Sequence, residues 1–169
     1  MEFRSATAAD VNALAAFSRK SFTRAFGHLY AAEDLAAFLD EYRAPERFAA
    51  MITDSAKVIT IAGTGRRLAG YSTLGLGSCF EARPYPQPHA PCILGQLYCE
   101  PGSGIGTALL ERAISQARAH GCDVMQLSVY AENFGAQRFY QRNGFAHVAD
   151  IDFWVGNHRD DEFLYELVL

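Results

Sequence analysis

Glycines at three alternate positions, in the stretch "YCEPGSGIGTALLERAI" of residues 98–114, carry the clearest chemical signal in the chain. Gly102, Gly104 and Gly106 lie between a strand-like run and a strongly helical one. Glycines leave the backbone open to another group, and the amino end of a helix offers N–H groups without intrahelical partners. The pattern therefore predicts a phosphate-binding turn formed by the amides of residues 103–108.

Two familiar phosphate-binding motifs do not fit this turn. No Lys-Ser or Lys-Thr pair follows the glycines, which excludes the Walker pattern. In the dinucleotide pattern G-x-G-x-x-G/A, a start at Gly102 puts Thr107 in the third slot, and a start at Gly104 puts Leu109 there. The turn also follows two antiparallel strands past the middle of the chain, whereas a Rossmann unit opens its domain with parallel strands.

A second stretch, "NFGAQRFYQRNGF" at residues 133–145, predicts a short helix. Asn133 is placed to cap its amino end, and Gly144 can take the left-handed conformation that ends it. Before the glycine turn, helices are expected from a Thr7 cap with Asp10 to about residue 25, from about residue 33, and over 44–52.

The rest of the chain has the pattern of strands. The segments 57–62 and 68–77 form an antiparallel pair, and residues 78–91 hold four of the six prolines and form a surface loop. Buried strands over 92–99 and 123–129 flank the helix 104–121 in a right-handed crossover. Two closing strands, over 147–155 and 162–169, are joined by a polar turn at 156–161. These elements predict an α/β sandwich that is antiparallel at both ends.

Composition limits the classes of function. The chain has 169 residues, half of them apolar and a fifth charged, which fits one ordinary globular domain. A net charge of −4 argues against nucleic-acid binding and mildly favours a cationic partner. No apolar run approaches the roughly 20 residues of a membrane span.

The four cysteines indicate reduced thiols. Cys79, Cys92, Cys99 and Cys122 form no C-x-x-C pair and have no histidine at metal-ligand spacing. The stretch "MEFRSATAAD" has no apolar run of the kind found in signal peptides. We therefore expect a cytoplasmic protein without a metal site.

The segments "LYCEPGSGIGTALL" and "LSVYAENFGAQRFYQRNGF" and the closing strand pair resemble the GCN5-related N-acetyltransferases, the GNAT superfamily, over nearly the whole chain. In that family a Q/R-x-x-G-x-G/A loop binds the pyrophosphate of acetyl-CoA, and an N-x-x-A-x-x-F-Y-x-x-x-G-F helix lies beside the pantetheine. The second pattern is met in full by Asn133, Ala136, Phe139, Tyr140, Gly144 and Phe145. The first departs at its Q/R position, which falls on Pro101, a residue without an N–H or a side-chain donor.

The resemblance implies a fold and an activity. The expected fold is a single GNAT-like domain over residues 1–169, with a mixed, mostly antiparallel sheet, a central splayed parallel strand pair and helices on both faces. The implied reaction is direct transfer of an acetyl group from acetyl-CoA to a primary amine. The segments 21–39 and 153–156 resemble a branch that includes polyamine acetyltransferases, which implies a small, cationic acceptor. The run "HRDDE" at 158–162 is compatible with such an acceptor or is only a solvated turn, and amino acids, aminoglycosides and a peptide amino terminus stay open as acceptors. Exposed terminal strands also make a homodimer an expectation.

The resemblance also assigns roles to residues. Tyr140 is implied as the proton donor to the departing CoA thiolate. The implied cofactor-binding residues are Leu97, Tyr98, Cys99, Gly102, Ser103, Gly104, Ile105, Gly106, Thr107, Ala108, Asn133 and Tyr140.

Each role has a plain structural alternative. The glycines can form an ordinary turn, and the strand end 97–99 can be plain sheet core. Tyr140 can be a core tyrosine, and Asn133 can be only a helix cap. A separate chemical alternative to direct transfer is a covalent route with Cys99 as the nucleophile. Four residues are candidates for the base, with none singled out: His28, Glu81, His89 and Glu100. Five aromatic residues are candidates for an acceptor pocket: Phe22, Phe26, Tyr30, Phe153 and Trp154. A rival function is a catalytically silent CoA-binding sensor or interaction module, which the substitution at Pro101 favours.

Overall fold

The computed structural model describes residues 1–65, 67–102 and 104–169. The helices are α1 (Val11–Phe26), α2 (Ala32–Tyr42), α3 (Pro45–Thr53), α4 (Ile105–Ala119) and α5 (Phe134–Arg142), with short 3-10 turns at Ala8–Asp10 and Gly27–Leu29. The strands are β1 (Glu2–Ser5), β2 (Lys57–Thr64), β3 (Arg67–Leu76), β4 (Pro91–Cys99), β5 (Val124–Tyr130), β6 (Ala146–Val155) and β7 (His158–Val168).

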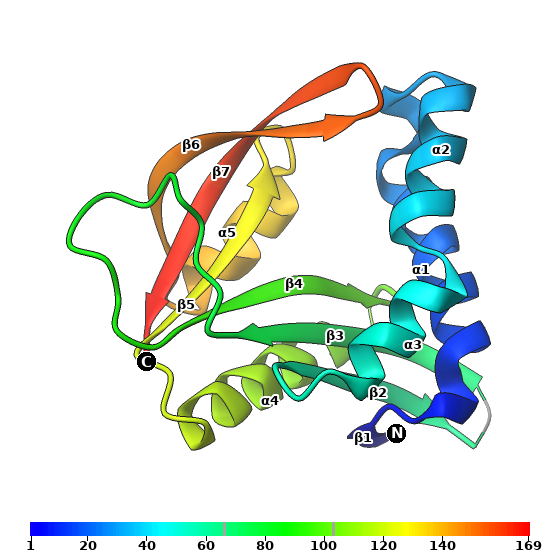
Figure 1. Cartoon of the computed structure of the whole chain (residues 1–169), viewed down its shortest axis with the longest axis horizontal. Coiled ribbons are helices and arrows are strands. Elements are labelled where there is room, and N and C mark those ends of the chain that lie inside the picture. Colours follow the sequence, from blue (N-terminus) through cyan, green and yellow to red (C-terminus); the bar gives the residue numbers. More distant parts are fainter. Residues whose placement is uncertain (66, 103) are drawn as a thin grey trace.

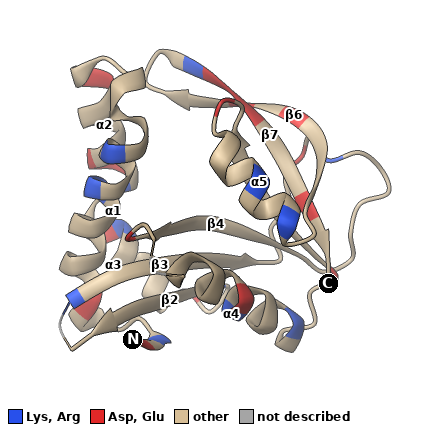
Figure 2. Ribbon diagram, turned by 180° about the vertical axis from the view of Figure 1, so that it is seen from behind, with Lys and Arg blue, Asp and Glu red and all other residues tan. Residues whose placement is uncertain are grey.

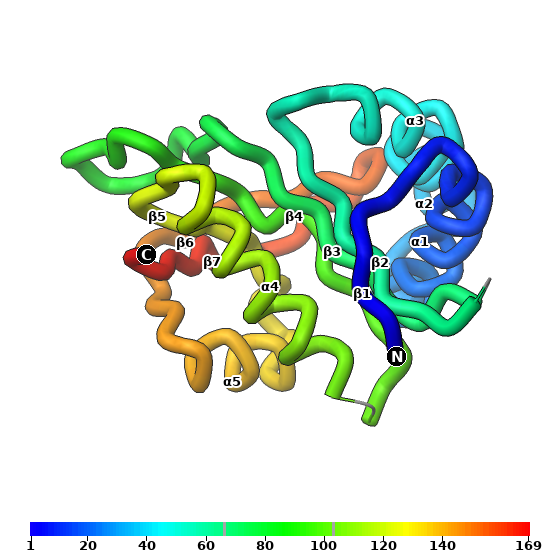
Figure 3. The backbone as a smooth tube through the Cα atoms, turned by 90° about the horizontal axis from the view of Figure 1, so that it is seen from below, coloured from blue at the N-terminus to red at the C-terminus, as the bar shows by residue number. Residues whose placement is uncertain are grey.

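Within the described residues, seven strands form one sheet in the order β1-β2-β3-β4-β5-β7-β6 (Figure 1). All neighbouring pairs are antiparallel except β4 and β5, which run parallel. The amino-terminal helices α1 to α3 lie on one side of the sheet, and α4 and α5 lie on the other (Figure 3). The predicted mixed sheet with helices on both faces is confirmed.

The two faces of the sheet have separate cores. On the α1 side, Leu14 and Phe48 pack on Tyr71 of β3, and all three are fully buried. On the α4 side, Leu110 packs against Met125 and Leu127 of β5. Burying a large apolar side chain stabilises the fold by about 1.5–3 kcal/mol each, so both cores hold the sheet firmly between its helices.

Pairing between the two parallel strands ends early. The paired positions are Pro91 with Val124, Cys92 with Met125, and Ile93 with Gln126. Beyond them, residues 94–99 pair only with β3 and residues 127–130 only with β7. We call these two unpaired edges the β4–β5 split. In Figure 1 the halves of the sheet diverge from this point, and α1 and α2 lie across the open end.

The closing hairpin is tighter than the sequence predicts. The expected polar turn at 156–161 is wrong, because only residues 156–157 lie between β6 and β7. Arg159 on β7 forms an ion pair with Asp152 on β6 at 2.7 Å, so polar side chains that suggest a loop interact across the hairpin instead. Asp160 is only 4% exposed and is part of the interior.

The proline-rich segment 77–90 is a loop, as expected, and it is anchored at the closed end of the split. Arg83 donates two hydrogen bonds to the carboxylate of Glu166 on β7, at 2.7 and 2.8 Å. The buried amide of Gln126 donates to the same carboxylate and accepts from the backbone N–H of Phe80. This network fixes the loop away from the open end of the sheet.

Replacement of Arg83 by Ala is expected to lower the free energy of unfolding by about 2–3 kcal/mol at neutral pH, because the Glu166 carboxylate, 9% exposed in the intact protein, loses its ion-pair partner. The hydrogen bonds from Arg83 lower the pKa of Glu166, so their stabilisation is present above the ordinary carboxyl pKa. It is lost as the pH falls through the lowered pKa.

Urea unfolding at neutral and acid pH measures this effect. The difference between wild type and the Arg83 variant should shrink in acid. Arg19→Ala is the control, because its ion pair with Asp40 is exposed and contributes at most about 1 kcal/mol. Equal losses for the two variants would contradict the anchoring role of Arg83.

Candidate active site

The glycine turn has the backbone conformation that requires glycine. Gly102 and Gly104 have φ angles of +73° and +71°, in the left-handed region. Any other L-residue there costs about 1–2 kcal/mol. Gly104 is the N-cap of α4, and Ser103, which is among the predicted cofactor-binding residues, lies outside the described residues.

The start of α4 offers four amides that precede its first internal bond. The N–H of Ala108 donates to the carbonyl of Gly104 at 3.2 Å and closes the first helical turn. The amides of Gly104, Ile105, Gly106 and Thr107 therefore lie at the positions that a helix leaves unpaired. The predicted amide range ends one residue too late, because the amide of Ala108 is already used.

Two contacts hold this helix end against the sheet. The side chain of Ile105 is 3% exposed and packs on Ala62 and Ala69. The backbone of Gly106 lies against Cys99, because a Cβ built on Gly106 would be 3.3 Å from the thiol sulfur. Glycine at this position thus lets α4 begin directly over the end of β4.

The end of β4 presents its two faces to different helices. Leu97 and Cys99 pack beneath α4, whereas the ring of Tyr98 lies on the opposite face, 5.9 Å from that of Tyr71. The Cys99 carbonyl accepts a hydrogen bond from Arg24 of α1 at 3.4 Å. Because this part of β4 does not pair with β5, its backbone edge is available to a ligand that can add as a strand.

Helix α5 begins and ends as predicted. The side chain of Asn133 accepts a hydrogen bond from the Ala136 N–H at 3.1 Å, and Gly144 follows the helix with φ +88°. The ring of Tyr140 is packed edge-on against Phe139 and Phe145.

The hydroxyl of Tyr140 is protonated at neutral pH. Burial raises its pKa above that of an ordinary tyrosine, and the nearby Tyr98 and Cys99 add to the rise. Within the described residues this hydroxyl has no hydrogen-bond partner. A protonated, unpartnered hydroxyl beside the end of β4 can donate a proton to a group bound in the split.

Aromatic side chains from α1 face β5 across the open end of the split. Phe26 contacts Tyr130 edge-on, with ring centroids 6.3 Å apart, and Phe22 stacks on Tyr30 at 6.0 Å. The Tyr30 hydroxyl donates a hydrogen bond of 2.5 Å to the carboxylate of Asp160. The structure thus brings the predicted Phe22, Phe26 and Tyr30 together.

The two remaining aromatic candidates, Phe153 and Trp154, lie on opposite faces of β6. Phe153 packs against Phe38 of α2, with ring centroids 5.7 Å apart. Trp154 follows it on β6 and is 56% exposed. Because side chains alternate along a strand, Trp154 points to the other face and does not join the group formed by Phe22, Phe26 and Tyr30.

The four candidates for the base do not gather at the split. Glu81 and His89 lie in the exposed loop at the closed end of the sheet, and His28 is exposed in the turn after α1. Glu100 is ion-paired with Arg67 at 2.8 Å.

Two carboxylates of the run "HRDDE" on β7 reach the α1 face of the sheet, and neither is among the predicted site residues. Asp160 is held by Tyr30 and by His158, whose Nε2 is 3.0 Å away. Glu162 is the cross-strand partner of Tyr130 on β5. Residues two apart on a strand share a face, so Asp160 and Glu162 point the same way.

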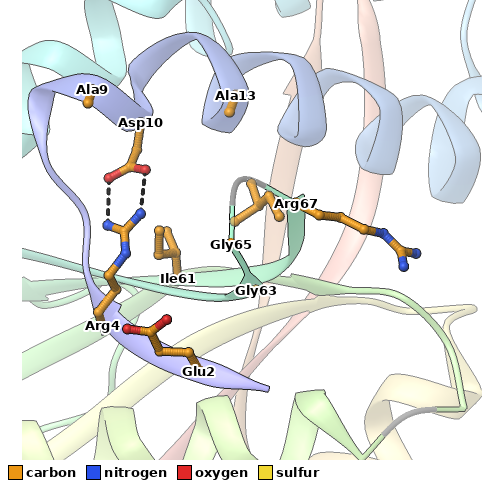
Figure 4. Close-up of a pocket in the computed structure, with 10 residues that line it drawn as sticks. Glu2, Arg4, Ala9, Asp10, Ala13, Ile61, Gly63, Gly65 and Arg67 are labelled. Atoms are coloured by element: carbon orange, nitrogen blue, oxygen red, sulfur yellow. Dashed lines mark hydrogen bonds and ion pairs between the residues drawn. The ribbon is translucent and has the colours of Figure 1, made fainter.

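A cavity of about 470 Å³ lies elsewhere, at the outer edge of the sheet beneath the start of α1 (Figure 4). Its charged wall is the pair formed by Arg4 and Asp10, with two hydrogen bonds of 2.8 Å. This cavity involves β1 and β2 and is separate from the split.

No helix within residues 1–65, 67–102 and 104–169 is long and apolar enough to cross a membrane. No group of three or more His, Cys, Asp or Glu side chains in them is arranged to hold a metal ion.

A sheet opened between two parallel strands, with a glycine-rich helix start beside the opening, defines a class of acyl-CoA-dependent transferases. The model of the acetyltransferase (GNAT) family matches residues 18–145, and the chain belongs to this family. It is an N-acetyltransferase that uses acetyl-CoA. The left-handed glycines, the free amides of α4 and the unpaired edge of β4 fit the phosphates and pantetheine of that cosubstrate.

Known proteins of this kind cover the whole chain. An uncharacterised N-acetyltransferase of Mycobacterium tuberculosis is 29% identical over 158 residues, which are 92% of this chain and 95% of the relative. The crystal structure of PaiA N-acetyltransferase from Thermoplasma acidophilum in complex with coenzyme A has a TM-score of 0.77 at 22% identity, and covers 99% of this chain and 98% of its own. A ribosomal-protein-alanine N-acetyltransferase from Brucella melitensis has a TM-score of 0.68 at 20% identity over the full length of both chains.

Proposed function

We propose that this enzyme, a single domain over residues 1–169, transfers an acetyl group directly to the primary amine of a small cationic acceptor of the polyamine type. The observation that carries the proposal is the pair of carboxylates, Asp160 and Glu162, beside the aromatic rings at the open end of the split. Carboxylates and aromatic faces are the groups that attract an organic ammonium ion.

The cosubstrate would lie on the α4 side of the split. The amides of Gly104, Ile105, Gly106 and Thr107 would hold its phosphates, with the α4 dipole adding a favourable field. The free edge of Leu97, Tyr98 and Cys99 would align its pantetheine. When bound, acetyl-CoA supplies the acetyl group as a thioester, and the Tyr140 hydroxyl would give its proton to the departing sulfur.

The acceptor would approach from the α1 side. Figure 2 shows that Asp and Glu residues recur along β6 and β7, the strands beside the proposed acceptor site. The net charge of −4 also favours a cationic partner. A homodimer stays a prediction.

Release of CoA thiol in the presence of a panel of amines tests the proposal. The panel should include diamines, polyamines, amino acids, aminoglycosides and a peptide with a free amino terminus. Amine-dependent thiol release that is fastest with the multiply charged amines is the expected result. CoA binding without release on any amine would favour the silent module instead.

Direct transfer predicts that no acetyl group resides on Cys99. Burial raises the pKa of this thiol, so the reactive thiolate is scarce at neutral pH. Peptide mapping by mass spectrometry after incubation with acetyl-CoA, in the absence of amine, should find Cys99 unmodified. An acetyl adduct on Cys99 that disappears when amine is added would contradict direct transfer.

A further inference from the structure

Glu162 lies on β7, one strand away from the β4–β5 split, beside the β5 segment that forms one edge of the split. It lies opposite Tyr130 of β5 and Ile151 of β6 in the sheet. Cross-strand partners share a face, so its side chain points the same way as Tyr130, toward the rings of α1. The negative charge of Glu162 contributes to the raised pKa values of Tyr30 and Tyr98.

The carboxylate of Glu162 is incompletely satisfied. Its Oε2 atom is buried and has no hydrogen-bond partner among the described residues. Nor does any Arg, Lys or His of this part of the chain form an ion pair with it. Most buried polar atoms have a partner, so an orphaned oxygen at the edge of a proposed active site indicates a group that a ligand completes.

The surroundings of Glu162 raise its affinity for a proton above that of an ordinary glutamate. Burial raises its pKa, a hydrogen bond from the Ser128 hydroxyl opposes the rise, and the negative charge of Asp160 adds to it. Tyr30, Tyr98 and Tyr130 face it from the other elements and stay neutral. Two arginines interact with other groups of this region. Arg43 lowers the pKa of Tyr98, and Arg24 donates a hydrogen bond to the carbonyl of Cys99.

The acid and the base of the reaction would then stand on opposite faces of the sheet. Tyr140 comes from α5 on the cofactor side, and Glu162 points to the acceptor side.

We propose that Glu162 is the catalytic base that takes a proton from the acceptor ammonium, an inference that rests on the function proposed above. The ammonium loses one proton to the Glu162 carboxylate, and the neutral nitrogen forms the C–N bond as the C–S bond of the thioester breaks. The thiolate takes the Tyr140 proton. The second proton of the nitrogen restores the Tyr140 hydroxyl, and Glu162 releases its proton to water.

Glu162→Gln tests this role, because it keeps the shape of the side chain and removes the base. With diaminopropane as acceptor, kcat/KM should fall about 100-fold or more. The dissociation constant of acetyl-CoA should change by less than about threefold, well below the tenfold change that corresponds to about 1.4 kcal/mol. The loss should shrink to less than about tenfold with the difluoro analogue of diaminopropane, whose less basic amines are largely neutral already. A structural role would give the same loss with both acceptors.

A matched control and a second variant keep the test decisive. Glu46→Gln removes an equal charge from exposed α3 and should leave both acceptors unaffected. Ser128→Ala removes the hydrogen bond that lowers the pKa of Glu162, so the acid limb of kcat/KM should move to higher pH. If Glu162→Gln does not fold, this shift decides the question, and its absence overturns the proposal.

The failures of the two proposals differ. Absence of turnover by the wild-type chain on every amine overturns the proposed function and the role of Glu162 with it. Turnover by the wild type that Glu162→Gln retains, or loses equally for both acceptors, overturns only the role of Glu162.

Discussion

Replacement of Tyr140 by Phe is expected to lower kcat by about 100-fold or more, which is the usual contribution of a positioned general acid. Burial raises the pKa of the hydroxyl, and Tyr98 and Cys99 at the end of β4 add to the rise, so the proton stays in place across the neutral range. Phe fills the same volume between Phe139 and Phe145, so the fold should be unaffected.

A loss of kcat without a loss of acetyl-CoA binding would identify Tyr140 as the general acid. Stopped-flow thiol release gives kcat, and calorimetry gives the dissociation constant of acetyl-CoA, which should change less than about threefold because no binding contact is lost. Tyr165→Phe is the control, since it also removes a buried hydroxyl, one that accepts from Gln141 at 3.2 Å. An undiminished kcat in Tyr140→Phe would mean that Tyr140 is only a core residue.

The second large effect is expected at Gly104. Gly104→Ala puts a Cβ on a residue with φ +71°, so the loop must relax or bear about 1–2 kcal/mol of strain. Relaxation turns the amides at the start of α4 away from the phosphates. Each charge-assisted hydrogen bond lost costs about 1.5–3 kcal/mol, so the affinity for acetyl-CoA should fall about tenfold to a hundredfold.

The other end of the same helix provides the control. Gly121 has φ +75°, and a Cβ there would meet no atom within 4 Å, as at Gly104. Gly121→Ala therefore carries the same backbone strain without touching the proposed phosphate site. Thermal unfolding should show similar losses of stability in the two variants, and only Gly104→Ala should lose affinity. Equal affinities in calorimetry would contradict the phosphate site.

Local signals predict most of the elements. The capping residues Thr7, Asn133 and Gly144 and the apolar periodicity of the helices depend on neighbours a few residues away, and the amide of Thr7 indeed bonds to Asp10 at 2.8 Å. The left-handed glycines likewise follow from the positions of Gly102 and Gly104 between a strand and a helix.

The acceptor side could not be predicted in the same way. The run "GNHRDDE" has the composition of a solvated turn, and only the register of β6 against β7 makes Arg159 pair with Asp152 and leaves Asp160 and Glu162 on the α1 face. The run from Asp160 to Glu166 reads D-D-E-F-L-Y-E and does not alternate between polar and apolar residues, so period-two patterning does not reveal the longer strand.

The extent of strand pairing is also a property of the whole sheet. The segments 92–99 and 123–129 both have the pattern of buried strands, so periodicity alone predicts that they pair along their length. Pairing instead stops at Ile93, and β4 has an irregularity in its pairing with β3 around Gly95. The splay depends on how the two halves of the sheet pack against their helices, which periodicity does not describe. It is therefore predicted from the family resemblance alone.

The most direct test of the cofactor site is a titration of isotope-labelled protein with CoA, followed through the backbone amide resonances by NMR. The proposed site predicts saturable shifts for the amides of Gly104, Ile105, Gly106 and Thr107, together with those along the free edge of β4, and little change in the cavity beneath α1. Saturable binding that leaves the four α4 amides unshifted would contradict the proposed site.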